Sequence, residues 1–387
     1  MISRIVRPVT LLALLVAFLT AASGAPARAG GFDQALGVWV TALEIRLASL
    51  EETARSVEGV PVSTRIARGP VLKPGMVDER VLQLSRRLVE LGYLAPGLER
   101  DTHDEILVAA VSVFQAERGL TPDGKVGGAT LSSLNVTPAQ EIASIRETLV
   151  RMAEFRASAP ATMVVVNLPA QELALVRNGE TVLTMETAVG SPSRPTPLLA
   201  DHITHVILNP TWTVPPTVLK QDKLPNLRRT GAPGIDHASV WLDGAVVDPA
   251  LVDWSGVSPW RVRIVQEAGD HNALGRYRFN LTNDDQIYLH GTNDPRVFNR
   301  DRRAVSSGCV RLADPGTLAE ELLMASGFSP SRISAMVDAG ETRWIRLAQP
   351  MPVRFVYWPA VLRGERVVVL PDIYGIVPPP ELIAAAN

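Results

Sequence analysis

Cys309 is the single cysteine of this 387-residue chain and lies in the segment Ser306-Ser307-Gly308-Cys309-Val310-Arg311. A thiol is a good nucleophile near neutral pH when its pKa falls, and a neighbouring imidazole produces that effect. A lone cysteine forms no intramolecular disulfide and supplies no multi-cysteine zinc or iron–sulfur site. The residue is therefore either a nucleophile or a small buried apolar side chain.

His290 is the histidine placed to act on this thiol. It follows the apolar residues Tyr288-Leu289, which end a predicted strand, and it opens a loop of fifteen residues that leads to Ser306. A neutral imidazole there takes the thiol proton and later protonates a leaving amine. The other histidines lie in a predicted helical unit, a strand and a long irregular segment: His103, His202, His205, His237 and His271.

Gly308 allows a tight turn before the cysteine. We expect this turn to direct the backbone N–H groups of Ser307, Gly308 and Cys309 toward a developing oxyanion. Between His290 and Arg311 the chain carries five arginines and two aspartates, a local charge of +3. Either this cationic loop holds substrate carboxylates, or it is a solvated loop in a chain that has only four lysines and uses arginine as its usual cation.

Length and composition limit the classes of protein to which this chain can belong. The length allows two or three domains, and 46% hydrophobic with 20% charged residues argues against bulk disorder. The formal net charge of -2 argues against a nucleic-acid-binding protein with a large basic field.

The N-terminus has the pattern of an export signal. Arg4 and Arg7 precede an apolar run from about Pro8 to Ala22, and Ala27-Arg28-Ala29 fits a signal peptidase site. The run is shorter than the ~20 apolar residues that span a bilayer, although an uncleaved anchor is the alternative. We expect a signal peptide at residues 1–29, cleavage after Ala29 and export to the periplasm, with no other membrane span.

The first half of the mature chain is predicted to be helical. Apolar residues recur at helical spacing in residues 33–57, and a proline-containing linker follows. Thr102 and Glu105 predict a capping box, as do Thr137 and Gln140, the second before a helix that bridges two domains.

After Pro160 the pattern changes to short apolar strands, with Asn178-Gly179 as a hairpin turn. The polar segment 215–274 is predicted to be an irregular lid over a site. The fold class is α+β, a small helical domain followed by a mostly β domain.

Residues 77–136 resemble the three-helix peptidoglycan-binding domain. The matching residues follow that family's pattern: Leu91-Gly92-Tyr93-Leu94, Ala110-Val111, Phe114-Gln115, Gly119-Leu120, Asp123-Gly124, Gly127 and Thr130. The segment from Ala95 to Asp104 lacks the usual DGxFG turn, which puts the glycan groove in doubt. The resemblance implies binding of glycan strands, and the alternative is a helical spacer.

His290-Gly291-Thr292, the loop and Ser306-Ser307-Gly308-Cys309-Val310-Arg311 resemble the motif of YkuD-type L,D-transpeptidases. Four flanking segments extend the likeness, two of them toward the large YcbB-like subgroup: 165–169, 190–197, 209–216 and 372–375. Gly291 and Ser307 depart from residues common in the subgroup. The resemblance covers about residues 75–375 and implies a sandwich-like catalytic domain.

The resemblance implies a two-step acyl transfer. Cys309 attacks the L,D-peptide bond of a tetrapeptide stem, D-alanine leaves, and the amine of a second stem resolves the thioester into a 3→3 crosslink. His290 is the base and then the acid, with its second ring nitrogen oriented by a backbone carbonyl. Ser306 supports the turn. Arg311 either fixes the cysteine loop or contacts a substrate carboxylate, and Arg194 and Thr196 shape the loop beside the site. The expected substrate-side residues are these: Arg311, Thr292, Tyr288, Arg194 and Thr196.

The resemblance implies no metal and no cofactor, peptidoglycan stem peptides as partners, and acylation of Cys309 by strained β-lactams such as carbapenems. Two other functions stay open, an L,D-carboxypeptidase or cysteine hydrolase of the same stems and a non-catalytic wall-binding protein.

The predicted organisation is a signal peptide, an N-terminal helix with linker, the helical domain, a bridging helix, the catalytic domain and a tail: 1–29, 30–76, 77–136, 137–160, 161–375 and 376–387.

Overall fold

The computed structural model describes residues 31–56 and 63–379. The predicted signal peptide lies outside these ranges, as does most of the predicted tail. Within them, no helix combines the length and the apolar character needed to cross a membrane.

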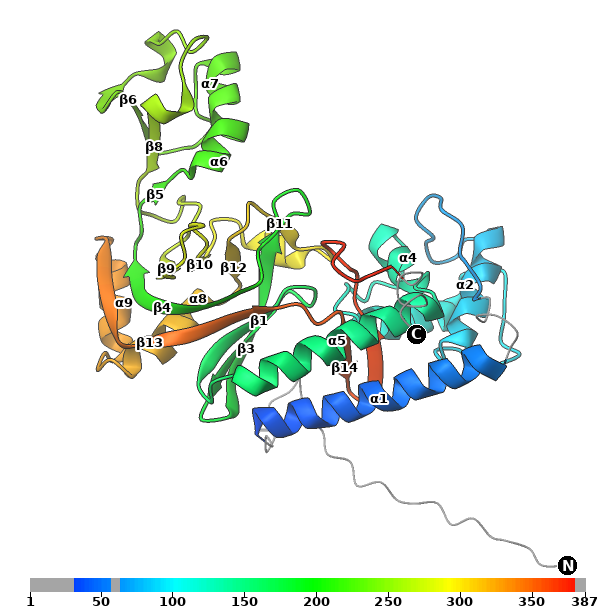
Figure 1. Cartoon of the computed structure of the whole chain (residues 1–387). Helices are drawn as coiled ribbons and strands as arrows, with labels where there is room; N and C mark the ends of the chain where they lie inside the picture. The colour runs from blue at the N-terminus through cyan, green and yellow to red at the C-terminus, as the bar shows by residue number, and fades with distance from the viewer. Residues whose placement is uncertain (1–30, 57–62, 380–387) are drawn as a thin grey trace, which may run out of the picture.

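The long N-terminal helix α1 (Phe32–Ser56) packs beside helix α5 (Pro138–Ser158), as Figure 1 shows. Both helices cover the hairpin of β14 (Ala360–Arg363) and β15 (Arg366–Val369). Trp358 lies at the centre of this packing, edge-on to Trp39 of α1 at 5.6 Å and to Phe155 of α5 at 5.0 Å between ring centroids. The capping box of Thr137 and Gln140 is confirmed at the start of α5.

A separate helical unit contains α2 (Glu79–Glu90), α3 (Glu105–Glu117) and α4 (Gly128–Leu134). Its buried core includes Ala110, Val111 and Phe114, which belong to the family pattern quoted in the sequence analysis. The predicted capping box of Thr102 and Glu105 is wrong. Asp104 caps α3 instead, because its carboxylate accepts from the amides of Ile106 and Leu107, whereas Thr102 pairs with Val77 in a short bridge.

The second half of the chain is built on a nine-stranded sheet in the order β11-β3-β12-β10-β9-β4-β13-β1-β2. Strand β2 also pairs with β3, so the sheet closes on itself and leaves β11 outside the ring. The strands have these bounds: β1 Met163–Asn167, β2 Glu172–Arg177, β3 Glu180–Gly190, β4 Leu199–Leu208, β9 Tyr277–Asn280, β10 Leu289–His290, β11 Ala304–Ser306, β12 Val310–Leu312 and β13 Arg343–Val356. Positive φ angles of 52° and 81° at Asn178 and Gly179 confirm the predicted hairpin turn between β2 and β3.

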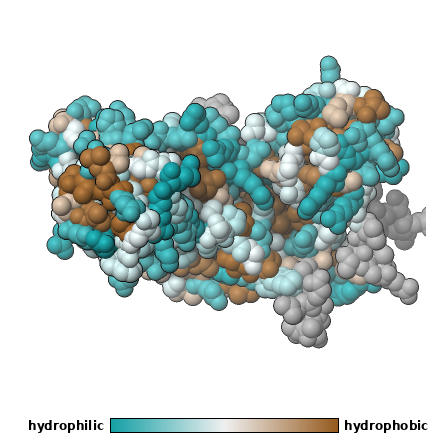
Figure 2. All heavy atoms as spheres, turned by 90° about the horizontal axis from the view of Figure 1, so that it is seen from above, coloured by the Kyte–Doolittle hydropathy of each residue, from teal (hydrophilic) through white to brown (hydrophobic). Residues whose placement is uncertain are grey.

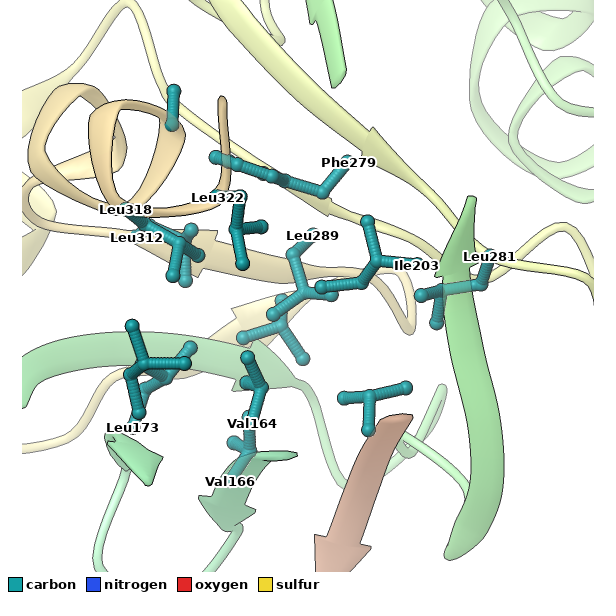
Figure 3. Packing of buried hydrophobic residues seen from close by; sticks show 14 of the residues in the cluster. Val164, Val166, Leu173, Ile203, Phe279, Leu281, Leu289, Leu312, Leu318 and Leu322 are labelled. Atoms are coloured by element: carbon teal, nitrogen blue, oxygen red, sulfur yellow. The ribbon is translucent and has the colours of Figure 1, made fainter. Parts of the chain in front are cut away.

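The inward faces of these strands form the main core. Figure 3 shows Leu318 and Leu322 of α8 (Pro315–Met324) packed against Phe279, Leu289 and Leu312 of the sheet. The short helix α9 (Pro330–Asp338) follows α8. This core holds β10 and β12 rigidly in the middle of the sheet.

The segment predicted to be an irregular lid is instead a folded, inserted subdomain. A four-stranded sheet in the order β5-β8-β6-β7 is covered by short helices, and Figure 1 shows the subdomain projecting away from the main sheet. Its elements have these bounds: β5 Trp212–Thr213, α6 Pro216–Val218, a π-helix Leu219–Lys223, α7 Leu224–Thr230, β6 Ala238–Leu242, β7 Ala245–Val247, 3₁₀ turns Pro249–Leu251 and Pro259–Arg261, and β8 Val262–Gln266.

The subdomain is ordered because it buries its own apolar cluster, which includes Trp254, Leu227 and Ile264. Its outer surface also exposes large side chains, with Leu251 and Trp260 each 84% exposed. Seen from above in Figure 2, hydrophilic residues cover most of the molecule and hydrophobic residues form separate patches.

Candidate active site

Strand pairing brings His290 and Cys309 to the same place. Strand β10 lies parallel to β12, with His290 opposite Arg311 and Leu289 opposite Val310. The amide of Val310 donates to the carbonyl of Tyr288 at 3.1 Å, so Cys309 precedes β12 at the level of Tyr288. Two residues nineteen positions apart in the sequence thus lie close together, His290 at the end of β10 and Cys309 directly before β12.

The turn before Cys309 is held by the Ser306 side chain. Its hydroxyl donates to the Cys309 carbonyl at 2.6 Å and accepts from the Gly308 amide at 3.1 Å. Gly308 has a φ of +114°, a backbone conformation that favours glycine. The expectation that three amides face an oxyanion is therefore corrected, because the Gly308 amide already has an acceptor. The backbone amides of Ser307 and Cys309 can still donate to the oxyanion.

Thr196 supports the same turn through its side chain. Its hydroxyl donates to the Gly308 carbonyl at 2.8 Å and accepts from the Gly190 amide at 2.8 Å. The Tyr374 hydroxyl donates to the Gly190 carbonyl at 2.9 Å and accepts from the Thr196 amide. Thr196 is thus a positioning residue rather than a substrate contact. The sequence analysis matched Tyr374 to a family segment but did not place it among the site residues.

Arg194 contacts protein groups rather than an open substrate position. Its guanidinium donates to both carboxylate oxygens of Asp222, at 2.7 and 2.6 Å, and to the Ser307 hydroxyl at 2.9 Å. The pKa of Asp222 is lowered, chiefly by its hydrogen bond from Arg194. Asp222 belongs to the π-helix of the inserted subdomain, so this contact joins the subdomain to the turn before Cys309. The sequence offered no signal for Asp222.

Burial favours the protonated form of the Cys309 thiol. Burial raises the pKa of Cys309 to about 11, in spite of opposing effects from Tyr288 and nearby arginines. The thiol donates to the carbonyl of Gln286 at 3.6 Å. The expectation that a neighbouring imidazole lowers this pKa does not hold in the resting structure, because loss of hydration outweighs the favourable charges.

His290 is buried and neutral, and its side chain is only 5% exposed. Burial, followed by the positive charge of Arg311, lowers its pKa to about 3. Among the described residues Nδ1 has no partner at strict hydrogen-bond geometry, but a backbone hydrogen bond to Gly291 opposes the lowering of the His290 pKa, which agrees with the expected backbone acceptor for the ring. The ring also packs edge-on to Tyr288, with 5.6 Å between centroids.

Tyr288 and Arg311 lie beside Cys309 and His290. Burial and the neighbouring Cys309 thiol raise the pKa of Tyr288. Arg278, which the sequence analysis did not select, stacks 4.1 Å from the centroid of the Tyr288 ring. Burial lowers the pKa of Arg311, and its Nε atom is buried with no partner among the described residues.

Thr292 lies in the loop after His290, where its hydroxyl accepts from the Asp294 amide at 3.1 Å. This contact shapes the loop. Gly275, at the return of the inserted subdomain, approaches this loop so closely that a Cβ there would lie 2.7 Å from the Thr292 amide nitrogen. The segment between β8 and β9 therefore packs directly on the loop that follows His290.

The thiol and imidazole line a cleft of about 390 Å³, a size that suits a small peptide ligand. One wall comes from the sheet and the turn, and the other from the base of the inserted subdomain. The residues of the second wall include these: Trp212, Pro215, Thr217, Asp222, Lys223 and Leu274. Across residues 31–56 and 63–379, no three histidine, cysteine or acidic side chains gather in a way that could hold a metal ion.

Comparison with known proteins gives two family matches. Residues 161–353 match the family described as "L,D-transpeptidase catalytic domain", YkuD, and residues 77–134 match the family described as "Putative peptidoglycan binding domain". A Haemophilus influenzae protein named "Putative L,D-transpeptidase" is 38% identical over 215 residues, which cover 54% of this chain and 43% of that protein. The match therefore spans less than half of the length of this curated relative.

Two solved structures are more distant. Mycobacterium tuberculosis L,D-transpeptidase 1 is 18% identical and matches over 51% of this chain and 61% of that chain, with a TM-score of 0.23. An L,D-transpeptidase from Mycobacterium smegmatis is 14% identical over 51% of this chain and 58% of that chain, with a TM-score of 0.26.

Proposed function

Because residues 161–353 belong to the YkuD family of L,D-transpeptidase catalytic domains and residues 77–134 to the peptidoglycan-binding domain family, we propose that this protein is a cysteine-dependent L,D-transpeptidase that forms 3→3 crosslinks in peptidoglycan. One observation carries the proposal: parallel pairing of β10 and β12 brings His290 and Cys309 into one cleft. Both steps of the proposed reaction use these two side chains and the turn that holds Cys309.

In the first step, the Cys309 sulfur attacks the carbonyl of the third residue of a tetrapeptide stem. His290 takes the thiol proton during the attack, since the resting thiol and the resting imidazole are both neutral. The oxyanion is stabilised by the amides of Ser307 and Cys309. The imidazolium then gives its proton to the departing amine, the peptide bond breaks, and D-alanine leaves with a thioester on Cys309.

In the second step, the side-chain amine of another stem attacks the thioester. His290 takes a proton from this amine and returns it to the sulfur as the new amide forms, so the thiol is regenerated. Water in place of the amine gives the carboxypeptidase reaction instead. The inserted subdomain forms one wall of the cleft, and binding of the second stem against this wall favours the amine over water.

The N-terminal pattern and the helical unit indicate where in the cell the protein acts. The predicted export signal and the peptidoglycan-binding domain support a location in the periplasm or cell envelope, with stem peptides as donor and acceptor and glycan strands held by the helical unit. No metal or cofactor takes part in the proposed reaction.

Muropeptide analysis tests this function. The purified protein is incubated with tetrapeptide-containing muropeptides, and the products are separated by chromatography and identified by mass spectrometry. New 3→3 dimers are the expected result. Trimmed tripeptides without dimers would instead identify a carboxypeptidase, and an unchanged profile would identify a non-catalytic wall-binding protein. Cys309→Ala is the control, and a Cys309→Ala protein as active as wild type would overturn the assignment.

A further inference from the structure

A second cavity adjoins the catalytic cleft and shares the segments 215–216 and 286–288 with it. Its volume is about 870 Å³, which is in the range of ligand pockets. We call it the outer groove. One wall comes from the inserted subdomain, from its base and from β8 with the 3₁₀ turn before it, and the other from β9 and the loop that leads to β10. The outer groove therefore lies between the subdomain and the main sheet.

The outer groove is cationic. It is lined by Lys220 of the π-helix, Arg263 of β8 and Arg278 of β9, whereas no aspartate or glutamate among the described residues lines it. Lys220 and Arg263 are exposed, so a ligand in the groove can reach both charges. Arg263 is held in place by its guanidinium, which lies 4.3 Å from the centroid of the Trp241 ring on the neighbouring strand β6. These charges favour an anionic ligand.

The carboxylates of the neighbouring elements have other partners. Asp222, in the same π-helix as Lys220, pairs with Arg194 at 2.6 Å. Asp243, which follows β6, pairs with Arg261. Within the described ranges, neither Lys220 nor the arginine of β8 therefore has a carboxylate partner, and both stay available to a ligand.

Trp260 gives the outer groove an aromatic wall. It lies in the 3₁₀ turn Pro259–Arg261, lines the groove, and is 84% exposed. Side chains of this size are usually well buried, and tryptophan is enriched where proteins bind ligands or partners. An apolar ring beside exposed cations suits a ligand that has both aliphatic groups and carboxylates, such as an acidic peptide.

The charge changes sign where the outer groove meets the catalytic cleft. Asn283 lines the groove, while the next two residues, Asp284 and Asp285, are exposed and line the cleft. We call these two aspartates the acidic pair. The following residue, Gln286, accepts from the Cys309 thiol through its carbonyl at 3.6 Å. An amine that enters the cleft from the groove thus meets two carboxylates close to the nucleophile.

We propose that the outer groove binds the acceptor stem of the crosslinking reaction. The carboxylates of this stem contact Lys220 and Arg263, and its aliphatic part packs on Trp260. Its side-chain amine extends past the acidic pair to the thioester on Cys309. The identity of the ligand rests on the proposed function. The donor stem must place its scissile carbonyl at the sulfur and so occupies the cleft, whereas the acceptor brings only an amine on a flexible side chain.

Nuclear magnetic resonance of the tryptophan indole N–H groups tests the groove directly. The probe is a disaccharide–tripeptide, which keeps the side-chain amine but lacks the terminal D-alanine of a donor. It is titrated into the full-length Cys309→Ala protein. We expect the Trp260 signal, assigned by its loss in Trp260→Phe, to shift and saturate. Trp358, which is 1% exposed and packs under α1 and α5, gives the control signal, and that signal should stay in place.

Charge-reversal variants identify the contacts. Lys220→Glu and Arg263→Glu should each weaken the binding read at the Trp260 signal about threefold to tenfold, because each removes a charge-assisted contact to a carboxylate. Arg229→Glu makes the same change at an exposed arginine of α7 that lines neither cavity, and it should leave the affinity unchanged. A Trp260 signal that does not move, or an affinity that both groove variants retain, would overturn the proposal. Equal binding of a tripeptide with amidated carboxyl groups would do so as well.

Crosslinking kinetics separate the acceptor from the donor. The donor is a disaccharide–tetrapeptide, and the acceptor is the disaccharide–tripeptide with an isotope label. In the Lys220→Glu/Arg263→Glu protein the KM of the acceptor should rise about tenfold, and the KM of the donor should change less than about twofold. An equal rise in both constants would contradict the assignment to the acceptor.

Trp260→Ala should also raise the KM of the acceptor more than that of the donor. Leu251→Ala is the matched control, because it shortens another side chain of the subdomain that is 84% exposed but lines neither cavity. The same KM change in both variants would show that Trp260 has no contact with the acceptor.

The two proposals fail separately. Crosslinks from a protein whose Trp260 signal does not respond would refute the outer groove as an acceptor site and leave the transpeptidase function intact. A saturable shift in a protein that makes no crosslinks would refute the transpeptidase function and leave the groove as a binding site for stem peptides.

Discussion

Arg194 and Asp222 form a bidentate ion pair, with two hydrogen bonds of 2.7 and 2.6 Å, between the loop after β3 and the π-helix of the inserted subdomain. Arg194 also donates to Ser307, two residues before the nucleophile. One side chain therefore links the inserted subdomain to the turn that positions Cys309. The pair lies at the edge of the catalytic cleft, where both the subdomain and the turn contribute lining residues.

Asp222→Asn tests the role of this link. The pair is partly exposed, so we expect a loss of at most about 1 kcal/mol in the free energy of unfolding. Because the subdomain is no longer held at the turn, crosslinking kcat/KM should fall about threefold to tenfold, which corresponds to about 1 kcal/mol. The charge-swapped Arg194→Asp/Asp222→Arg protein should recover part of this loss. A wild-type rate in Asp222→Asn would refute the role.

The pH dependence of thiol alkylation tests the resting protonation state. Because burial raises the pKa of Cys309 to about 11, the thiolate fraction should rise about tenfold per pH unit between pH 7 and 9. The rate of iodoacetamide modification, followed by mass spectrometry, should rise in parallel. A rate that is already constant above pH 6 would show a preformed thiolate–imidazolium pair and contradict the neutral resting state.

A carbapenem should acylate Cys309. Its strained lactam carbonyl presents the same electrophile as the stem peptide, and ring opening leaves a thioester without loss of a fragment. Intact mass spectrometry should show one adduct with the mass of the whole drug, absent in Cys309→Ala. An enzyme that crosslinks muropeptides but carries no adduct would contradict this expectation.

Gly308→Ala should separate activity from stability. A φ of +114° strains an alanine, and its Cβ would lie 3.1 Å from Ile287 Cδ1. We expect a loss of about 1–3 kcal/mol in the free energy of unfolding, together with a large loss of crosslinking, because the Cys309 turn must move. Gly340→Ala is the matched control. Its φ is +74° and its Cβ would meet no atom within 4 Å, so it should lose stability but keep activity.

His103 should make the protein sensitive to acid. It is fully buried in the helical unit, and burial lowers its pKa. The unfolded chain binds a proton near pH 6.5 while the folded chain does not, so stability is present above that pH and falls below it. The slope is at most about 1.4 kcal/mol per pH unit for this site.

Thermal unfolding between pH 7.5 and 5 provides the measurement. His290 is also buried with a lowered pKa and contributes with the same sign, so the difference between wild type and His103→Leu isolates the part that belongs to His103. The Tm of His103→Leu should fall less steeply on acidification. Parallel curves for the two proteins would show that His103 does not contribute.

Local signals allowed much of the architecture to be predicted. The capping box of α5 and the turn at Asn178 depend on residues within a few positions of one another. The cap of α3 was mispredicted within that same range, because Asp104 competes with Thr102 for the first free amides of the helix. The inserted subdomain was mispredicted because its apolar residues are scattered and pack only when its short strands pair.

The sequence by itself determined the family motif, the helical and β-rich halves of the chain, and the choice of Cys309 and His290, since these follow from residue type, order and spacing. Only the tertiary structure decided the protonation of that pair, because burial is a property of the packed site. It also decided the partners of Arg194 and the role of Thr196. Each of these depends on residues that are distant in the sequence and adjacent only after folding.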